Sequence, residues 1–183
     1  MNYFPFFPYT LLAFGIAALI WLICIFKFFK TDNLYKIDRI PRNFIFGSIF
    51  AVIDIAWCVP QAIPIFGVKD ATGIILLAVV CIIIGCGFLD YLFARALAGF
   101  FILLAHFFLW QSFAADISFM WLFSILCYAM GTFGIVIGAV PHIFRDLLRK
   151  ICRDNKFKMY FSLLLVLYAI VNIYLGIALI VSG

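Results

Sequence analysis

The feature that most constrains this chain is a series of apolar stretches, each close to twenty residues long, separated by short polar segments. A helix rises about 1.5 Å per residue, so about twenty apolar residues are needed to cross a bilayer core. Lipid offers the backbone no hydrogen-bonding partner, so such stretches must be helical. They cover about residues 9–26, 43–66, 72–89, 96–113, 117–140 and 159–181. The sequence therefore predicts an all-α integral membrane bundle of six transmembrane helices, with residues 1–183 forming a single transmembrane domain.

Composition agrees with this prediction and excludes a soluble domain. Hydrophobic residues make up 68% of the chain and charged residues 11%, against roughly half and a quarter in a typical globular domain. The net charge of +5 does not indicate a nucleic-acid partner, because the basic residues lie in short segments that flank the apolar stretches. We expect a lipid bilayer around the protein and no nucleic acid.

The basic residues also predict an orientation. If both termini lie outside, the inner segments contain twelve of the thirteen Lys and Arg residues, and Lys69 is the exception. Enrichment of Lys and Arg in short cytoplasmic segments is the usual orientation signal. The sequence predicts N-out and C-out topology, and we expect a bacterial inner (plasma) membrane.

Two segments depart from a plain apolar helix. Pro60 and Pro64 fall in the outer half of the second stretch, and proline removes a backbone donor and clashes with the preceding turn. We expect that helix to kink or stop there, with residues 61–68 irregular and Lys69 and Asp70 marking the turn. Between the fifth and sixth stretches, residues 141–153 alternate apolar and basic side chains at helical spacing. This pattern predicts a short basic amphipathic helix in the inner headgroup layer, where residues 143–158 would meet anionic lipid headgroups or a cytoplasmic partner.

Several classes of enzyme site are missing from the sequence. There is no His-Glu-x-x-His, no Gly-x-Ser-x-Gly, no glycine-rich phosphate loop and no glutamate. The six cysteines contain no Cys-x-x-Cys pair, so we interpret them as buried apolar side chains. We predict no catalytic residue, metal or cofactor on this basis.

Three polar residues fall at similar depth within the apolar stretches. Counting from the nearest basic residue at the inner face, Asp54 lies about 18 Å deep, His106 about 16 Å and Asn172 about 21 Å. An ionisable group at mid-membrane is costly and should face protein or water. We therefore expect Asp54 to be buried and bonded to His106 or Asn172, with Gln61 and Tyr168 as further polar neighbours. These five residues form the candidate substrate-binding site.

Three functions are compatible with this pattern. A transporter or channel for a small solute or ion would use the polar site around Asp54. An accessory or assembly subunit of a larger membrane complex, or a homo-oligomer, would use its apolar surfaces, including Gly134-x-x-x-Gly138, which alternatively packs within the bundle. An intramembrane enzyme would use Asp54 and His106 as acid and base. Alternatively, the polar residues at mid-membrane only form hydrogen bonds that fix helix packing. Asp90 and Arg95 could form an ion pair, but we expect both to be hydrated at the inner boundary of the membrane.

Overall fold

The computed structural model describes residues 5–66, 72–88, 90–117 and 119–182, and every regular element in them is helical. The long helices are α1 (Phe7–Phe28), α3 (Phe44–Phe66), α4 (Thr72–Phe88), α5 (Leu92–Ala115), α6 (Met120–Ala139) and α8 (Asn155–Ser182). A segment of short turns connects α1 to α3 and contains α2 (Leu34–Ile37), and the helix α7 (His142–Arg153) connects α6 to α8. The all-α prediction is confirmed.

Five segments of the described chain are long and apolar enough to cross a membrane. They correspond to α1, α5, α6, α8, and α3 with part of the segment before it. The segment that includes α3 begins at Leu34 and contains the charged residues Lys36, Arg39 and Arg42 before α3 starts. Its apolar part is therefore α3 itself. The expected third span, α4, has 17 residues, or about 26 Å of helix, slightly less than the usual core thickness. Its membrane crossing remains a prediction.

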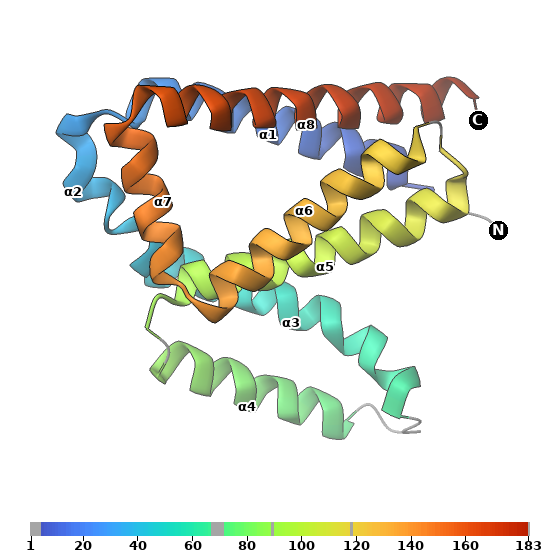
Figure 1. The fold of residues 1–183 in the computed structure, drawn as a ribbon. Coiled ribbons are helices and arrows are strands. Elements are labelled where there is room, and N and C mark those ends of the chain that lie inside the picture. The colour runs from blue at the N-terminus through green and yellow to red at the C-terminus, as the bar shows by residue number, and fades with distance from the viewer. Residues whose placement is uncertain (1–4, 67–71, 89, 118, 183) are drawn as a thin grey trace.

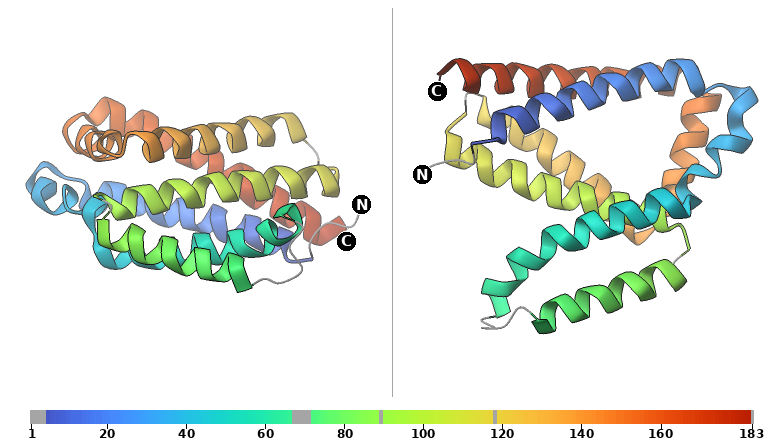
Figure 2. Two further views of the ribbon diagram at one scale, coloured as in Figure 1. Left: turned by 90° about the horizontal axis from the view of Figure 1, so that it is seen from below. Right: turned by 180° about the vertical axis from the view of Figure 1, so that it is seen from behind.

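The long helices form a zigzag of packed pairs (Figure 1). α1 and α8 lie side by side, as do α5 and α6. These two pairs approach each other near the chain termini and diverge towards the opposite end, where α7 crosses from one pair to the other (Figure 2). α3 packs on α5, and α4 packs on α3. Both chain termini therefore lie at one end of the molecule, and α2 and α7 lie at the other.

Glycines allow the closest helix contacts. A Cβ atom added at Gly134 of α6 would lie 2.8 Å from the carbonyl oxygen of Ala98 on α5. One added at Gly15 of α1 would lie 3.2 Å from the carbonyl oxygen of Ala169 on α8. In lipid, such close packing replaces the hydrophobic effect as a source of helix association. Gly134 and Gly138 thus serve packing within the bundle, one of the two uses expected for them.

α5 contacts three of the other long helices, namely α1, α3 and α6. Its Phe108 ring lies 6.3 Å from Phe7 and 5.4 Å from Phe14 of α1, and 5.9 Å from Phe123 of α6, measured between ring centroids. Phe100 lies 5.3 Å from Phe50 of α3 in an edge-to-face arrangement, the geometry that aromatic pairs favour. Many of the phenylalanine side chains therefore pack between helices.

The amphipathic helix is confirmed, but the use of its apolar face differs from the prediction. Phe144, Leu148 and Ile151 of α7 are at most 5% exposed, and they pack in a core cluster with residues of α1, α5 and α6. This face is covered by the protein itself, because α7 lies across the open end of the diverging helix pairs and packs on them (Figure 1). The prediction that this face of α7 inserts into lipid as an anchor is therefore wrong.

The second span was expected to kink or stop at its prolines, with residues 61–68 irregular; a kink is observed, whereas the helix does not stop and residues 61–66 are helical (Figure 1). α3 continues as a helix through Pro60 and Pro64 to Phe66, and its ribbon bends in the second half (Figure 1). A bend lets a helix accommodate the proline ring without ending. Gly67 and Val68, the last residues expected to be irregular, and the turn at Lys69 and Asp70 lie outside the described residues.

Candidate functional site

Asp54 lies between α3 and α5. Its residue surface is 9% exposed, and its carboxylate faces Gly99, where an added Cβ would lie 2.9 Å from Oδ2. Closer to the start of both helices, a Cβ at Gly47 would lie 2.7 Å from the backbone nitrogen of Phe93. The two glycines let α3 and α5 approach closely, and this approach is what buries the carboxylate.

The buried carboxylate lacks a complete set of partners. In the described part of the chain, Oδ1 of Asp54 is buried and accepts no hydrogen bond. Leaving a buried acceptor unsatisfied costs about 1–3 kcal/mol, and more when the group is charged. An acidic group within a long apolar helix is therefore costly unless it meets a partner or water.

A cavity of about 210 Å³ reaches this carboxylate. It lies among three helices, and its lining is mostly apolar apart from Asp54, Cys81 and Arg95. The lining residues are Ala51, Asp54 and Ile55 of α3, Cys81, Ile82 and Gly85 of α4, and Leu92, Arg95 and Ala96 of α5. Because α4 forms one wall, any movement of α4 would change access to Asp54.

The structure does not bring the predicted site residues together. His106 is exposed and lies seven residues beyond Gly99 on α5, which is about 10 Å further along the helix. The prediction of shared depth was wrong because it took Arg95 as the membrane boundary. α5 begins at Leu92 and aligns with α3 so that Gly99 lies opposite Asp54. The acid–base pair that an enzyme would need is therefore not formed.

Asn172 and Tyr168 belong to a separate part of the bundle, on α8. Asn172 is fully buried, its Nδ2 donates to the carbonyl oxygen of Tyr168 at 2.8 Å, and its Oδ1 has no partner among the described residues. The Tyr168 hydroxyl donates to Sδ of Met130 on α6 at 3.6 Å. One of these bonds lies within α8 and the other connects α8 to α6. The side chain of Gln61 lies outside the described residues.

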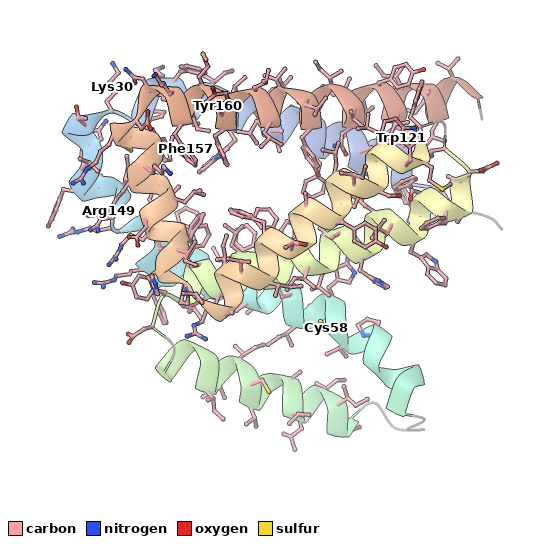
Figure 3. The ribbon with its side chains drawn as sticks, in the orientation of Figure 1. Lys30, Cys58, Trp121, Arg149, Phe157 and Tyr160 are labelled. Carbon is pink, nitrogen blue, oxygen red and sulfur yellow. The ribbon has the colours of Figure 1, made fainter. Side chains whose placement is uncertain are left out.

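The end of the molecule that contains α2 and α7 has polar contacts that sequence reasoning missed. Arg149 of α7 binds Asp38, and Arg42 and Arg145 both donate to the Tyr91 hydroxyl. Figure 3 shows Arg149 and Lys30 at this end, and Trp121 at the other. No spacing rule relates residues so far apart in sequence, although the shared inner location of the basic segments was a signal. Asp90 and Arg95 form no ion pair in the described part of the chain.

Among the described residues, no group of three or more metal-ligating side chains is found. Cys127 and Cys152 are buried as expected, whereas Cys58 and Cys81 are exposed. The expectation that all the cysteines are buried was therefore wrong for these two.

Comparison with protein-family models, with curated proteins and with solved structures finds no match.

Proposed function

We propose that this protein transports a proton or a small cation across the membrane, and that Asp54 is the group that binds it. The observation that carries this proposal is the buried carboxylate of Asp54, whose Oδ1 lacks a partner among the described residues and which lines a cavity. A carboxylate can take up and release a proton or coordinate a cation, and intramembrane acidic groups commonly mark such pathways. α4 is the wall whose displacement would open the site.

The proposal includes an arrangement in the membrane. The chain crosses six times as a single domain, with both termini outside, in a bacterial inner membrane. The gathering of Arg42, Arg145 and Arg149 at the α7 end, opposite both termini, supports this orientation. At that end, residues 143–158 would also meet anionic lipid headgroups through the exposed basic side chains Lys150, Arg153 and Lys156.

Flux through the purified protein tests the transport proposal. The protein is reconstituted into liposomes that contain a pH-sensitive or cation-sensitive dye, and a potassium gradient with valinomycin sets an inside-negative potential. We expect the wild-type protein to accelerate proton or sodium entry above the rate of empty liposomes. Asp54→Asn keeps the shape of the side chain but removes its charge, so the flux should disappear while the variant stays folded and monodisperse.

Asp116→Asn is the matched control. Asp116 is exposed at the outer end of α5 with φ of 45°, and asparagine tolerates this left-handed conformation as well as aspartate does. Its flux should equal that of the wild-type protein. Equal flux for wild type and Asp54→Asn would contradict the proposal.

An accessory subunit is the second candidate, and the surface of α4 favours it. α4 packs on α3, while Leu76, Leu77, Ile83 and Ile84 are at least half exposed. That apolar surface suits either lipid or a helix of another subunit, including a second copy. Absence of flux, together with a partner subunit that copurifies with the wild-type protein and is lost when Leu76 and Ile83 are both changed to alanine, would support this candidate instead.

A further inference from the structure

A second polar site lies at the inner end of the helices, away from Asp54. Tyr91, just before α5, has φ of 59°, a left-handed conformation that non-glycine residues rarely adopt. Its hydroxyl accepts a hydrogen bond of 2.7 Å from Nη2 of Arg42 and one of 3.3 Å from Nη1 of Arg145. The guanidinium carbon of Arg42 also lies 4.7 Å from the Tyr91 ring centroid. The segments before α3 and α5 and the helix α7 thus meet at one tyrosine.

A cavity of about 270 Å³ adjoins this tyrosine and contains both signs of charge. Its lining consists of Arg42, Phe44, Asp90, Tyr91 and Leu92. Arg42 and Asp90 are exposed, whereas Leu92 is buried and also lines the Asp54 cavity. The cavity therefore combines a guanidinium, a carboxylate and two apolar side chains at the level where basic and aromatic residues meet lipid headgroups.

We propose that this cavity binds the headgroup of a phosphatidylethanolamine-type lipid. The guanidinium of Arg42 has five N–H donors in a planar fork, a geometry that matches phosphate oxygens. The carboxylate of Asp90 accepts hydrogen bonds from the primary ammonium group of the same headgroup. Phe44 and Leu92 contact the glycerol and the first carbons of the acyl chains.

The charges distinguish this headgroup from its common alternatives. A glycerol headgroup has no cation for Asp90, so its phosphate would bind beside an unpaired carboxylate. A choline headgroup has no N–H to donate, and the Tyr91 face that could bind a quaternary ammonium group is covered by Arg42. Ethanolamine is the one of these three headgroups that satisfies both charged side chains. This proposal does not depend on transport through Asp54.

Native mass spectrometry of the full chain tests the proposal. The delipidated protein is mixed with equal concentrations of phosphatidylethanolamine, phosphatidylcholine and phosphatidylglycerol with the same acyl chains. We expect the ethanolamine lipid to give the most abundant adduct. A wild-type preference for the glycerol or choline lipid would overturn the proposal, and this measurement does not depend on any variant.

Variants assign the preference to the two charged residues. Arg42→Gln should reduce the retention of all three lipids, and Arg42→Lys should restore part of it, because lysine keeps the charge without the fork. Asp90→Asn should reduce the preference for ethanolamine over glycerol while keeping phosphate binding. An unchanged lipid profile in Arg42→Gln or in Asp90→Asn would overturn the proposal.

The chain offers a close control for the arginine. Arg39 lies 4.4 Å from the ring centroid of Tyr35 and donates to its hydroxyl, but it does not line the cavity. Arg39→Gln therefore removes the same kind of arginine–tyrosine pair and should leave the lipid profile unchanged. Asp116→Asn serves the same purpose for Asp90. A loss of lipid in Arg39→Gln equal to that in Arg42→Gln would show a general charge effect and overturn the assigned site.

Soluble competitors separate headgroup recognition from simple phosphate binding. O-phosphoethanolamine in excess should displace the bound lipid, because it offers both charged groups. Inorganic phosphate at the same concentration should not. Equal displacement by the two compounds would remove the role assigned to Asp90 and overturn the proposal.

Discussion

Asp38 and Arg149 are joined by two hydrogen bonds although 111 residues separate them in the sequence. Nε of Arg149 donates to Oδ1 of Asp38 at 2.6 Å, and Nη2 donates to Oδ2 at 2.7 Å. Two parallel bonds of this kind fix the orientation of both side chains. The pair connects the end of α2 to α7, and so holds the segment between α1 and α3 against the helix that connects the diverging ends of the two helix pairs.

Acid should weaken this connection. The hydrogen bond from Arg149, helped by the charges of Arg149, Arg145 and Arg153, lowers the pKa of Asp38 below its ordinary value of 3.8. A carboxyl group with a lower pKa in the folded state stabilises the fold fully above its ordinary pKa. That contribution is lost as the pH falls through the lowered value. We expect Arg149→Gln to lower the thermal midpoint in detergent at pH 7, and the difference from wild type to shrink as the pH falls below 3.8 and to disappear below the lowered pKa of Asp38. A difference that persists in acid would contradict this account.

Adding a methyl group at Gly134 should destabilise the α5–α6 contact. The new Cβ would lie 2.8 Å from the Ala98 carbonyl oxygen and 3.2 Å from Cβ of Phe101, and overpacking of this kind costs about 1–3 kcal/mol. Gly73→Ala on α4 is the control, since nothing lies within 4 Å of its added Cβ. We expect Gly134→Ala to lower the thermal midpoint and Gly73→Ala to leave it unchanged or raise it slightly. Equal midpoints for both variants would contradict the packing described here.

Gly99 and Asp54 should show strong energetic coupling. The atoms within 4 Å of a Cβ added at Gly99 are Oδ2 and Cγ of Asp54. Gly99→Ala should therefore destabilise the wild-type protein and have much less effect in the Asp54→Ala background. Contacting residues typically give interaction energies of about 0.5–3 kcal/mol in such double-mutant cycles. Additive effects would show that Asp54 does not pack on Gly99.

Labelling with a membrane-impermeant thiol reagent tests the orientation. In a cysteine-free background, Asp116→Cys lies in the turn that we place outside, and Asn155→Cys lies at the start of α8, which we place inside. Both wild-type residues are exposed. Intact cells should label Asp116→Cys, whereas Asn155→Cys should react only after the membrane is permeabilised. The reverse pattern would contradict termini on the outside.

The sequence predicts the helices better than it predicts their contacts. A run of apolar residues is a local property, so the stretch at residues 9–26 falls within α1, and the alternation at residues 141–153 becomes α7. Contacts depend on where each helix begins. Phe93 of α5 lies beside Gly47 of α3, so Arg95 is about two helical turns further along the bundle than Arg42. Gly99, rather than His106, therefore lies opposite Asp54. The packing of α7 on the other helices was missed because an amphipathic pattern shows that one face is apolar but not whether protein or lipid covers that face.

The pairing of α1 with α8 has a consequence for how the protein is made. α1 is the first helix of this sequence to leave the ribosome, and its main packing partner, α8, is the last. Between Phe28 and Asn155 the ribosome must add 127 residues (155 − 28), which takes about 6–25 s at typical rates of synthesis. During that time α1 has to remain in the bilayer without α8. A nascent chain stalled before Asn155 would therefore expose α1 to the insertion machinery, while the α3–α5 contact would already be able to form.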